Sequence, residues 1–581
     1  MKCICFPSRR RIRLERRMFA VFLGLALFGA SSGMGQNPFV PPPSRISPLE
    51  PRPFSLAPDN LPPPSLDVLQ PRVEAQAYPS LAFHVAAFRF KGNHVFSEKQ
   101  LAEIVAPYVG RTINAEELEA ARLAVTAAYV QKGYVNSGAI LDDQDLEGGV
   151  VVLTIVEGTL NEIEVRGNFW LRSNFIKRRV EHWAGPPLQV GRIQEALLLL
   201  NEQPMIVKVN ADLQPAGEPG KSRLVVNVKE HFPFHAGLEF SNDRPASVGA
   251  EHLDFIGSDQ SLTGNGDALD VRLGLINRTH SGWESSFDNF ALAYTLPLSS
   301  WDTTLRLSYR QNDYTVIEEP ISELGIDGKS NSFDITLRQP LYHTLNCQFA
   351  LSVTGSRRHS ESFLGGQRFS FSPGTVNGEE NVSVLRFGQE WLYRSQQQVI
   401  ALRSNFHFGV NAFDATMNGT DRDGRFFAWL GQGQYVRRLD QRGTQIILRA
   451  DGQWTSDQLL SLEQFAIGGI DTVRGYRENE IVRDKGVIGS AELRVPLWIN
   501  GIGKPIVQLA GFYDAGAGWS VDDITPDPKY LQSAGAGLIF TPNERINAEI
   551  YWAHRFTQIE TTGKKDLQDY GLNFRVSILA F

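Results

Sequence analysis

Cysteine is scarce in this chain. Three cysteines occur in 581 residues, and two of them, Cys3 and Cys5, lie at the very beginning. If residues 1–35 are removed as a signal peptide, only Cys347 remains, and one thiol cannot form a disulfide within the chain. A disulfide scaffold is therefore excluded. No cysteine directly follows the apolar run near the beginning, which argues against a lipid anchor there.

Long apolar runs and catalytic motifs are missing as well. After the first 35 residues no stretch is long and apolar enough for a transmembrane helix, which needs about 20 residues. The chain contains no P-loop, no G-x-S-x-G and no H-E-x-x-H, and "TDRDGR" (420–425) lacks the glutamate of a calcium loop. We therefore expect no enzymatic activity, no cofactor and no metal site.

The first 35 residues have the pattern of a secretory signal peptide. A basic segment precedes the 13-residue apolar run "MFAVFLGLALFGA" (18–30), and small residues follow in "SSGMGQ", so cleavage near Gly35 is expected. A membrane anchor is the alternative, but 13 residues are too few to span a bilayer. Cleavage would remove a net charge of +6 from a total of −7 and leave about −13. This balance argues against nucleic acid as a partner.

Three regions follow the predicted signal peptide and precede the alternating segments that begin at residue 232. Residues 36–81 are rich in proline, with 13 prolines between positions 38 and 79, and predict an extended linker without a core. Within it, "PSLDVLQPRVEAQ" has room for a helical turn or two. Residues 82–158 and 159–231 resemble two copies of one small α/β unit: "FRFKGN" (88–93) aligns with "IEVRGN" (163–168). Each copy predicts a pair of helices on a small sheet that presents an open edge.

The predicted helices of these copies carry recognisable signals. Ser97, three residues before Gln100, matches a capping box. In "NAEELEAARLAVTAAYVQKG" (114–133), an apolar stripe is expected on one helix face. Its members are Leu118, Ala121, Leu123 and Val125.

From residue 232 onward, polar and apolar residues alternate in short segments separated by turns. Short connections alternate with long loops at 313–330, 356–379, 456–487 and 515–532, which is typical of an outer-membrane barrel with an even number of strands. Residues 232–581 therefore predict a 16-stranded antiparallel transmembrane β-barrel. Its segments lie near 234–241, 249–256, 268–277, 287–296, 303–312, 331–338, 346–355, 380–393, 400–410, 425–437, 444–455, 488–497, 506–514, 533–540, 546–555 and 570–581.

One long loop and one strand suggest a contact inside the barrel. The loop 456–487 contains "GGIDTVRGY" (468–476), and "VQLAGFYDAGAGW" (507–519) places Asp514 on the face opposite Leu509. If Leu509 faces lipid, Asp514 faces the lumen, where a guanidinium is its best-matched partner. We expect the glycines to let the loop bend inward and Arg474 to pair with Asp514. Spacing alone also allows Arg474 to remain solvated and Asp514 to be one of many lumen charges.

These motifs resemble the paired signatures of the BamA/FhaC superfamily. The loop motif is Val473, Arg474, Gly475 and Tyr476, and the strand motif is matched by Phe512, Asp514 and Gly516. Together with two amino-terminal repeats, which are similar to POTRA domains, and a terminal Phe581, the chain resembles the TpsB transporters of two-partner secretion, the ShlB/FhaC/HecB group. The resemblance covers residues 82–581. The amino-terminal plug helix often found in that family is doubtful here, because residues 36–81 are rich in proline.

The resemblance implies a function and a set of partners. It implies an outer-membrane transporter of a Gram-negative-type bacterium that captures an unfolded TpsA-like partner protein in the periplasm and moves it to the cell surface. It also implies contact with outer-membrane lipid and with the barrel assembly machinery, with Phe581 as the C-terminal assembly signal. The alternative is a BamA- or TamA-like assembly factor, which usually carries more POTRA repeats. A passive pore would leave the two repeats without a role.

Overall fold

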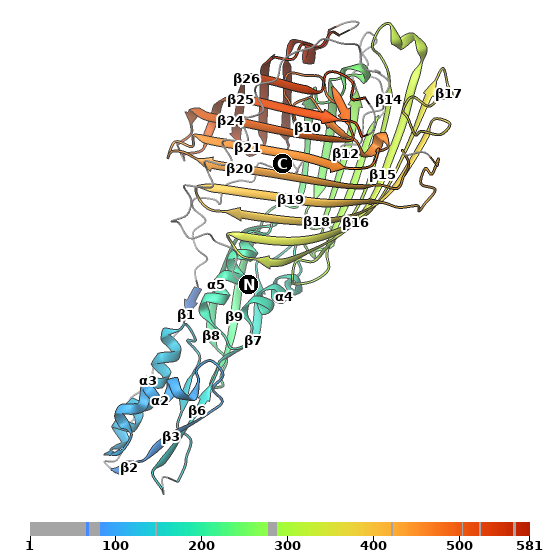
Figure 1. The fold of residues 1–581 in the computed structure, drawn as a ribbon. Coiled ribbons are helices and arrows are strands. Elements are labelled where there is room, and N and C mark those ends of the chain that lie inside the picture. Colours follow the sequence, from blue (N-terminus) through green and yellow to red (C-terminus); the bar gives the residue numbers. More distant parts are fainter. Residues whose placement is uncertain are drawn as a thin grey trace.

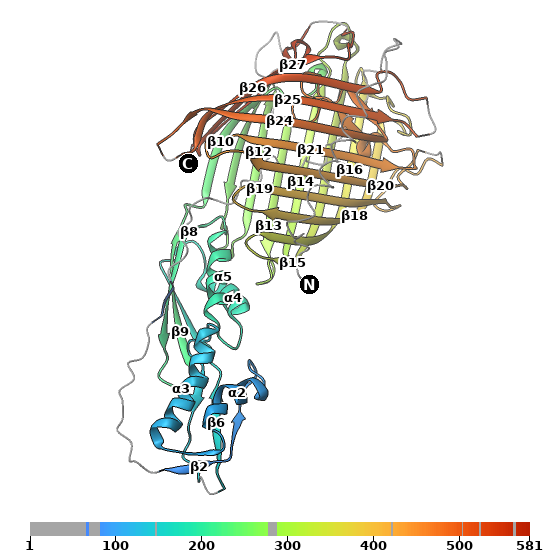
Figure 2. The ribbon, with the colours of Figure 1, turned by 60° about the vertical axis from the view of Figure 1, so that its left-hand side comes forward.

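The computed structural model describes residues 66–68, 82–145, 148–276, 288–419, 422–501, 503–521, 524–561 and 565–580. The predicted signal peptide (1–35), most of the predicted linker (36–81) and Phe581 lie outside the described residues. Figure 1 shows a wide barrel from which the amino-terminal units extend as a narrow arm, and Figure 2 shows the same arm from another side. No helix in the described part of the chain is both long and apolar enough to cross a membrane.

The first α/β unit has two helices packed on a small mixed sheet. Strand β6 lies between β3, which is parallel to it, and β5, which is antiparallel, while β2 and β4 form a separate pair. The elements are β2 (Phe83–Val85), β3 (Ala87–Lys91), α2 (Glu98–Val105), η1 (Ala106–Tyr108), β4 (Arg111–Ile113), α3 (Ala115–Gln131), β5 (Gly138–Ile140) and β6 (Val150–Val156).

The helices of this unit begin where their caps predict. Ser97 caps α2 through the expected capping box with Gln100, which pairs two backbone N–H groups that the first helical turn leaves without an intrahelical partner. In α3 the core-facing stripe contains Leu118, Ala121 and Val125. The prediction that Leu123 belongs to this stripe is wrong, because its side chain is 46% exposed. Ala121 and Val125 are two positions away from Leu123, and residues at that spacing point to opposite sides of a helix.

The second α/β unit continues the arm toward the barrel. Its elements are β7 (Thr159–Arg166), α4 (Ser173–Ala184), α5 (Val190–Asn201), β8 (Ile206–Pro215) and β9 (Lys221–Glu230). The sheet order is β1-β8-β9-β7, and the outermost strand β1 (Leu66–Val68) comes from the predicted linker. It lies parallel to β8, with Leu66 opposite Ala211. The three residues of β1 contain no proline, so their backbone N–H groups can join a ladder although prolines occur on both sides in the sequence.

The barrel is closed and antiparallel, and the prediction of sixteen strands is confirmed. A two-residue strand, β17 (Gln367–Arg368), only extends the end of β16. The sixteen strands are β10 (Phe234–Ser241), β11 (His252–Asp259), β12 (Ala268–Ile276), β13 (Asn289–Pro297), β14 (Thr304–Thr315), β15 (Ile326–His343), β16 (Cys347–Leu364), β18 (Glu379–Arg394), β19 (Gln398–Gly409), β20 (Phe427–Arg438), β21 (Gln445–Thr455), β24 (Lys485–Ile499), β25 (Pro505–Trp519), β26 (Tyr530–Asn543), β27 (Ile546–Arg555) and β28 (Leu572–Leu579).

Several strands extend into segments that the sequence assigned to loops. The predicted loop 356–379 is wrong for residues 356–364, which belong to β16, and β15 begins at Ile326, inside the predicted loop 313–330. These extensions carry polar residues on both faces, so they show no alternation of hydropathy. They are nevertheless strands because β15 and β16 satisfy each other's backbone groups along their whole length. Short 3₁₀ turns lie in the connections: η2 (Ala246–Val248), η3 (Ile321–Leu324) and η5 (Leu567–Tyr570).

The inward and outward faces of the wall differ as expected for a barrel. Along β25, Ala510, Phe512 and Asp514 are buried, whereas Leu509 and Tyr513 are exposed on the outer face. This alternation aims the carboxylate of Asp514 into the lumen.

Candidate functional site

The connection between β21 and β24, residues 456–484, folds into the barrel, and we call it the inserted loop. It contains η4 (Ser461–Glu463) and a two-stranded hairpin of β22 (Phe465–Ile467) and β23 (Ile481–Arg483). The tip of the hairpin is buried: Val473 and Tyr476 are inaccessible to solvent, and Arg474 is nearly so. A loop on the outer side of the barrel thus places its tip among lumen-facing side chains.

Glycine is required at two positions of this tip. Gly469 has a φ of +104°, and a Cβ at this position would collide with the carboxylate of Glu478. That carboxylate accepts a hydrogen bond from the backbone N–H of Ile470 (2.9 Å), which fixes the turn. Gly475 has a φ of +86°, and a Cβ there would lie 2.5 Å from the Cβ of Ala553 on β27. A side chain at either position would push the tip away from the wall.

Arg474 and Asp514, which the sequence suggested as a pair, are in direct contact. The guanidinium donates from Nε to Oδ2 of Asp514 (2.7 Å) and from Nη2 to Oδ1 (2.8 Å). The backbone N–H of Arg474 donates to the same carboxylate at 3.1 Å. This forked arrangement matches the two planar groups, and Asp514 is wholly buried.

The guanidinium has further partners that the sequence did not suggest. Its Nη1 donates to Glu492 on β24, and its Nη2 donates to the hydroxyl of Ser490 at 3.2 Å. The carbon at its centre lies 3.6 Å from the centroid of the Phe512 ring and 4.8 Å from that of Tyr551. Phe512 of the strand motif therefore provides an aromatic face for the cation.

The other motif residues complete the packing around this cation. The hydroxyl of Tyr476 donates to the carbonyl of Gln532 at 2.7 Å and accepts the backbone N–H of Thr557 at 3.0 Å. Val473 belongs to an apolar cluster with Ile467 and Ile481 of the hairpin. A Cβ on Gly516 would lie 2.6 Å from Ile467, so glycine leaves room there for the hairpin.

A second anchor lies near the start of the inserted loop, away from the tip, and in it the charges of loop and wall are exchanged. Here the loop supplies the carboxylate, Glu463, and the wall supplies Arg386 of β18 (2.7 Å) and Arg358 of β16 (3.1 Å). Glu380 of β18 also accepts the hydroxyl of Ser461 (2.7 Å). No signal in the sequence selected Glu463 or these two arginines, and the sequence placed Arg358 in a predicted loop (356–379) although this residue belongs to β16.

A third group of contacts joins the loop to the last strand. The amide side chain of Asn573 on β28 accepts the N–H of Gly475 at 2.9 Å, and Arg575 of β28 contacts Asp471 of the loop at 3.3 Å. Arg477 donates to Asp569, just before β28, at 2.8 and 2.7 Å. β18 is the eighth and β28 the sixteenth strand of the closed order. The contacts of the loop with β18 and its contacts with β28 therefore lie about half a circumference apart.

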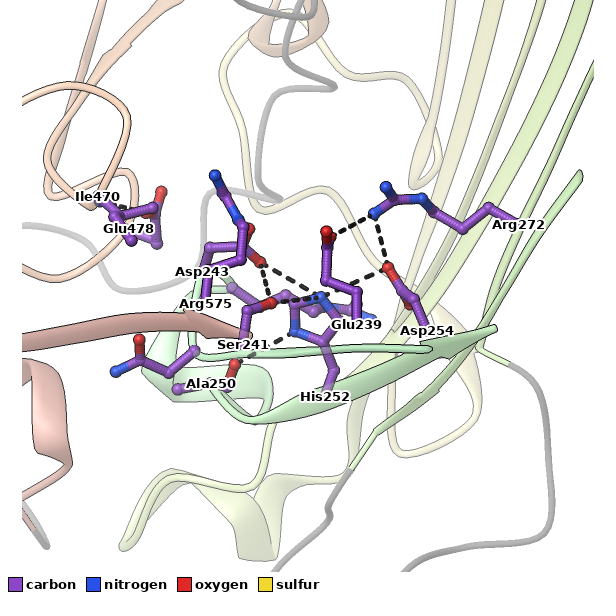
Figure 3. A network of polar contacts seen from close by, with 12 residues as sticks. Glu239, Ser241, Asp243, Ala250, His252, Asp254, Arg272, Ile470, Glu478 and Arg575 are labelled. Atoms are coloured by element: carbon purple, nitrogen blue, oxygen red, sulfur yellow. Dashed lines mark hydrogen bonds and ion pairs between the residues drawn. The ribbon is translucent and has the colours of Figure 1, made fainter. Parts of the chain in front are cut away.

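The same strand closes the barrel against β10, and a polar network covers this seam (Figure 3). The ladder between β10 and β28 runs from Gly237 opposite Leu579 to Ser241 opposite Arg575. Arg575 also donates to Asp243, just beyond β10, at 2.6 Å (Figure 3). The inserted loop, the first strand and the last strand are thus joined through one guanidinium.

A neighbouring part of the network involves β10, β11 and β12. Arg272 of β12 donates to Asp254 (2.8 Å) and to Glu239 (3.1 Å), and His252 contacts Ser241 at 3.2 Å (Figure 3). Within the described ranges, no three His, Cys, Asp or Glu side chains are grouped so that they could hold a metal ion.

Comparison with known proteins shows that two family models match this chain. A model described as "Haemolysin secretion/activation protein ShlB/FhaC/HecB" matches residues 220–540, which is more than half of the chain, and a model of the ShlB-type POTRA domain matches residues 83–158. The chain belongs to the ShlB/FhaC/HecB family of haemolysin secretion/activation proteins. It is therefore an outer-membrane transporter of two-partner secretion, with its POTRA domains in the periplasm.

Individual members of the family resemble the chain over most of its length. The outer membrane transporter CdiB of Dickeya dadantii is 24% identical over 72% of this chain and 73% of its own. The heme/hemopexin transporter protein HuxB of Haemophilus influenzae (strain 86-028NP) is 22% identical over 78% and 79%. The solved structure of CdiB from Escherichia coli has a TM-score of 0.64 at 21% identity and covers 88% of this chain and 93% of that one. This ShlB/FhaC/HecB assignment favours the transporter over the assembly factor.

Proposed function

We propose that this transporter captures an unfolded exoprotein by its POTRA domains and passes it through the barrel beside the inserted loop. The observation that carries the proposal is the loop itself, which is held in the lumen by the Arg474–Asp514 contact and by a second anchor at Glu463. Polar anchors of this kind can be broken and re-formed, whereas a covalent plug cannot. Charged inward faces would solvate a polar polypeptide during passage.

Capture would use the open edges of the two POTRA sheets. An extended client can add a strand to such an edge through backbone hydrogen bonds, with little demand on its sequence. In the second unit the edge of β8 is occupied by β1. We infer that Leu66–Val68 hold this edge as a placeholder strand until a client replaces them.

The proposal extends to the assembly of the transporter. We propose that Phe581 ends a C-terminal signal read by the barrel assembly machinery, and that outer-membrane lipid covers the exposed apolar face of the barrel. The exposed outward residues of β25 and of its neighbours support the second point. No catalytic step is needed, since folding of the client outside the cell would bias its movement outward.

Deletion of the gene tests the proposed function. The expected result is the loss of one secreted protein from the cell surface and medium, while the other outer-membrane proteins keep their abundance. A broad decrease of outer-membrane proteins would instead support a BamA- or TamA-like assembly factor. Complementation with the full chain controls for effects on neighbouring genes.

A further inference from the structure

The connection between β7 and α4 in the second POTRA unit, residues 167–172, carries an aromatic tip. Phe169 at this tip is 81% exposed. The tip is rigid because the carboxylate of Glu230 accepts the backbone N–H groups of Phe169 (2.9 Å), Trp170 (2.7 Å) and Leu171 (3.0 Å). The fold therefore holds a large apolar side chain in an exposed position, which is unfavourable in water and typical of an interaction site.

In the first POTRA unit a glutamate also accepts backbone N–H groups of the equivalent connection, but the residue at the tip is different. There Glu157 accepts the N–H groups of His94 (2.6 Å) and Val95 (2.7 Å). The aligned segments are "GNHVF" (92–96) and "GNFWL" (167–171), so His94 stands where the second unit has Phe169. The last residue of each segment is buried and serves the core. Of the two units, the one with the aromatic tip is the one that lies next to the barrel (Figure 1).

The aromatic tip is continuous with the outer face of the barrel. The ring of Trp170 lies 5.8 Å from that of Phe232 and 5.9 Å from that of Phe234, measured between centroids. Phe234 begins β10, and Leu238 and Phe240 of the same strand are exposed on the outer face. A strip of apolar side chains therefore runs from the membrane-facing wall to Phe169. Aromatic residues are enriched where the hydrocarbon of a bilayer meets its headgroups.

The charges near the tip suit anionic headgroups. Residues 167–179 contain no Asp or Glu and four basic residues, of which Arg172 and Arg178 are exposed. The fourth, Arg179, is committed to the barrel, since it donates to Asp302 in the turn between β13 and β14 at 2.8 Å. The backbone N–H of Arg172 donates to the carbonyl of Gly264 at 2.8 Å. Two contacts with the periplasmic rim thus fix the height of the tip relative to the membrane.

We propose that Phe169 and Trp170 insert into the periplasmic leaflet of the outer membrane, with Arg172 and Arg178 on anionic phospholipid headgroups. Insertion would hold the second POTRA unit at the rim of the barrel and fix the direction in which its sheet presents a client. Aromatic side chains beside basic ones are the composition that binds a membrane surface. The inference rests on the membrane location of the barrel and not on the role proposed for the inserted loop.

Site-directed fluorescence tests the inserted tip. The full chain with Cys3→Ser, Cys5→Ser and Cys347→Ser receives one cysteine at a time, by Phe169→Cys or by the matched control His94→Cys, and each variant is labelled with an environment-sensitive dye. Both variants are reconstituted in vesicles of phosphatidylethanolamine and phosphatidylglycerol that contain a spin-labelled quencher lipid. The label at 169 is expected to be quenched several-fold more strongly than the label at 94. Equal quenching at the two positions would overturn the proposal.

Further arms of the experiment distinguish the occupants of the tip. Arg172→Gln with Arg178→Gln, or vesicles of phosphatidylcholine alone, should reduce the quenching at 169. Shielding of this label that appears only when the protein concentration is raised would indicate a second copy. Shielding that requires an added exoprotein fragment would indicate the client. Either result, without lipid quenching, refutes the membrane insertion of the tip.

Discussion

Replacing Arg474 by alanine should release the tip of the inserted loop while leaving the barrel assembled. The substitution removes the guanidinium contacts with Asp514, the contact with Glu492, and the cation above Phe512. Two buried carboxylates then lose a cationic partner. Breaking a buried pair by removing one partner costs roughly 3–5 kcal/mol. At about 1.4 kcal/mol for each factor of ten, the inserted position loses roughly a hundred- to several-thousand-fold of its preference.

Two measurements check this expectation. Export of the secreted client should decrease at equal surface abundance of the transporter, and single-channel conductance in planar bilayers should become larger or noisier as the tip leaves the lumen. Arg474→Lys keeps the charge but not the forked geometry, so an intermediate defect is expected. Arg425→Ala is the control, because this arginine is exposed and its ion pair with Asp423, at 3.6 Å, lies away from the loop tip. Wild-type export and conductance in Arg474→Ala would refute the reasoning.

Three further predictions concern other parts of the chain. Glu463→Gln leaves Arg358 and Arg386 without their carboxylate, so the folded barrel should lose its heat-resistant mobility on gels at a lower temperature; an unchanged transition would contradict the second anchor. Deleting residues 66–68 should free the edge of β8 and increase binding of an unfolded client fragment in fluorescence anisotropy, and unchanged affinity would exclude that edge. Although burial raises the pKa of the Glu157 carboxyl, hydrogen bonds from Val95 and His94 lower it below its ordinary 4.5. The ionised Glu157 carboxylate therefore stabilises the first unit fully above about pH 4.5, and this stabilisation is lost as the pH falls through the lowered pKa. Glu157→Gln should thus speed amide exchange of the first unit at about pH 6 but much less at about pH 3.

The sequence predicted best where a repeating physical pattern was present. Alternation with a period of two identified all sixteen barrel strands, since one face of each strand meets lipid and the other the lumen. The same alternation placed Asp514 on the inner face, and the family resemblance then favoured Arg474 as its partner. The structure places these two residues in contact, and their role in export is a prediction that Arg474→Ala tests.

Other features could not be predicted because they depend on tertiary contacts. The polar ends of β15 and β16 are strands only because they pair with each other. Strand β1 is three residues long and has no periodicity of its own, so its position on β8 could not be foreseen. Glu463 is one acid among many until the fold brings Arg386 beside it. In each case the information lies in the partner, which can be far away in the sequence.

The final strand has a consequence for biogenesis. Asn573 and Arg575 lie on β28, the last barrel strand in chain order, and they contribute both to the seam with β10 and to the contacts that hold the loop tip. A chain that stops before them loses wall and plug in a single event. Closure of the barrel wall and seating of the inserted loop thus depend on the same strand, so a copy without β28 would have neither a closed barrel nor a fully anchored tip.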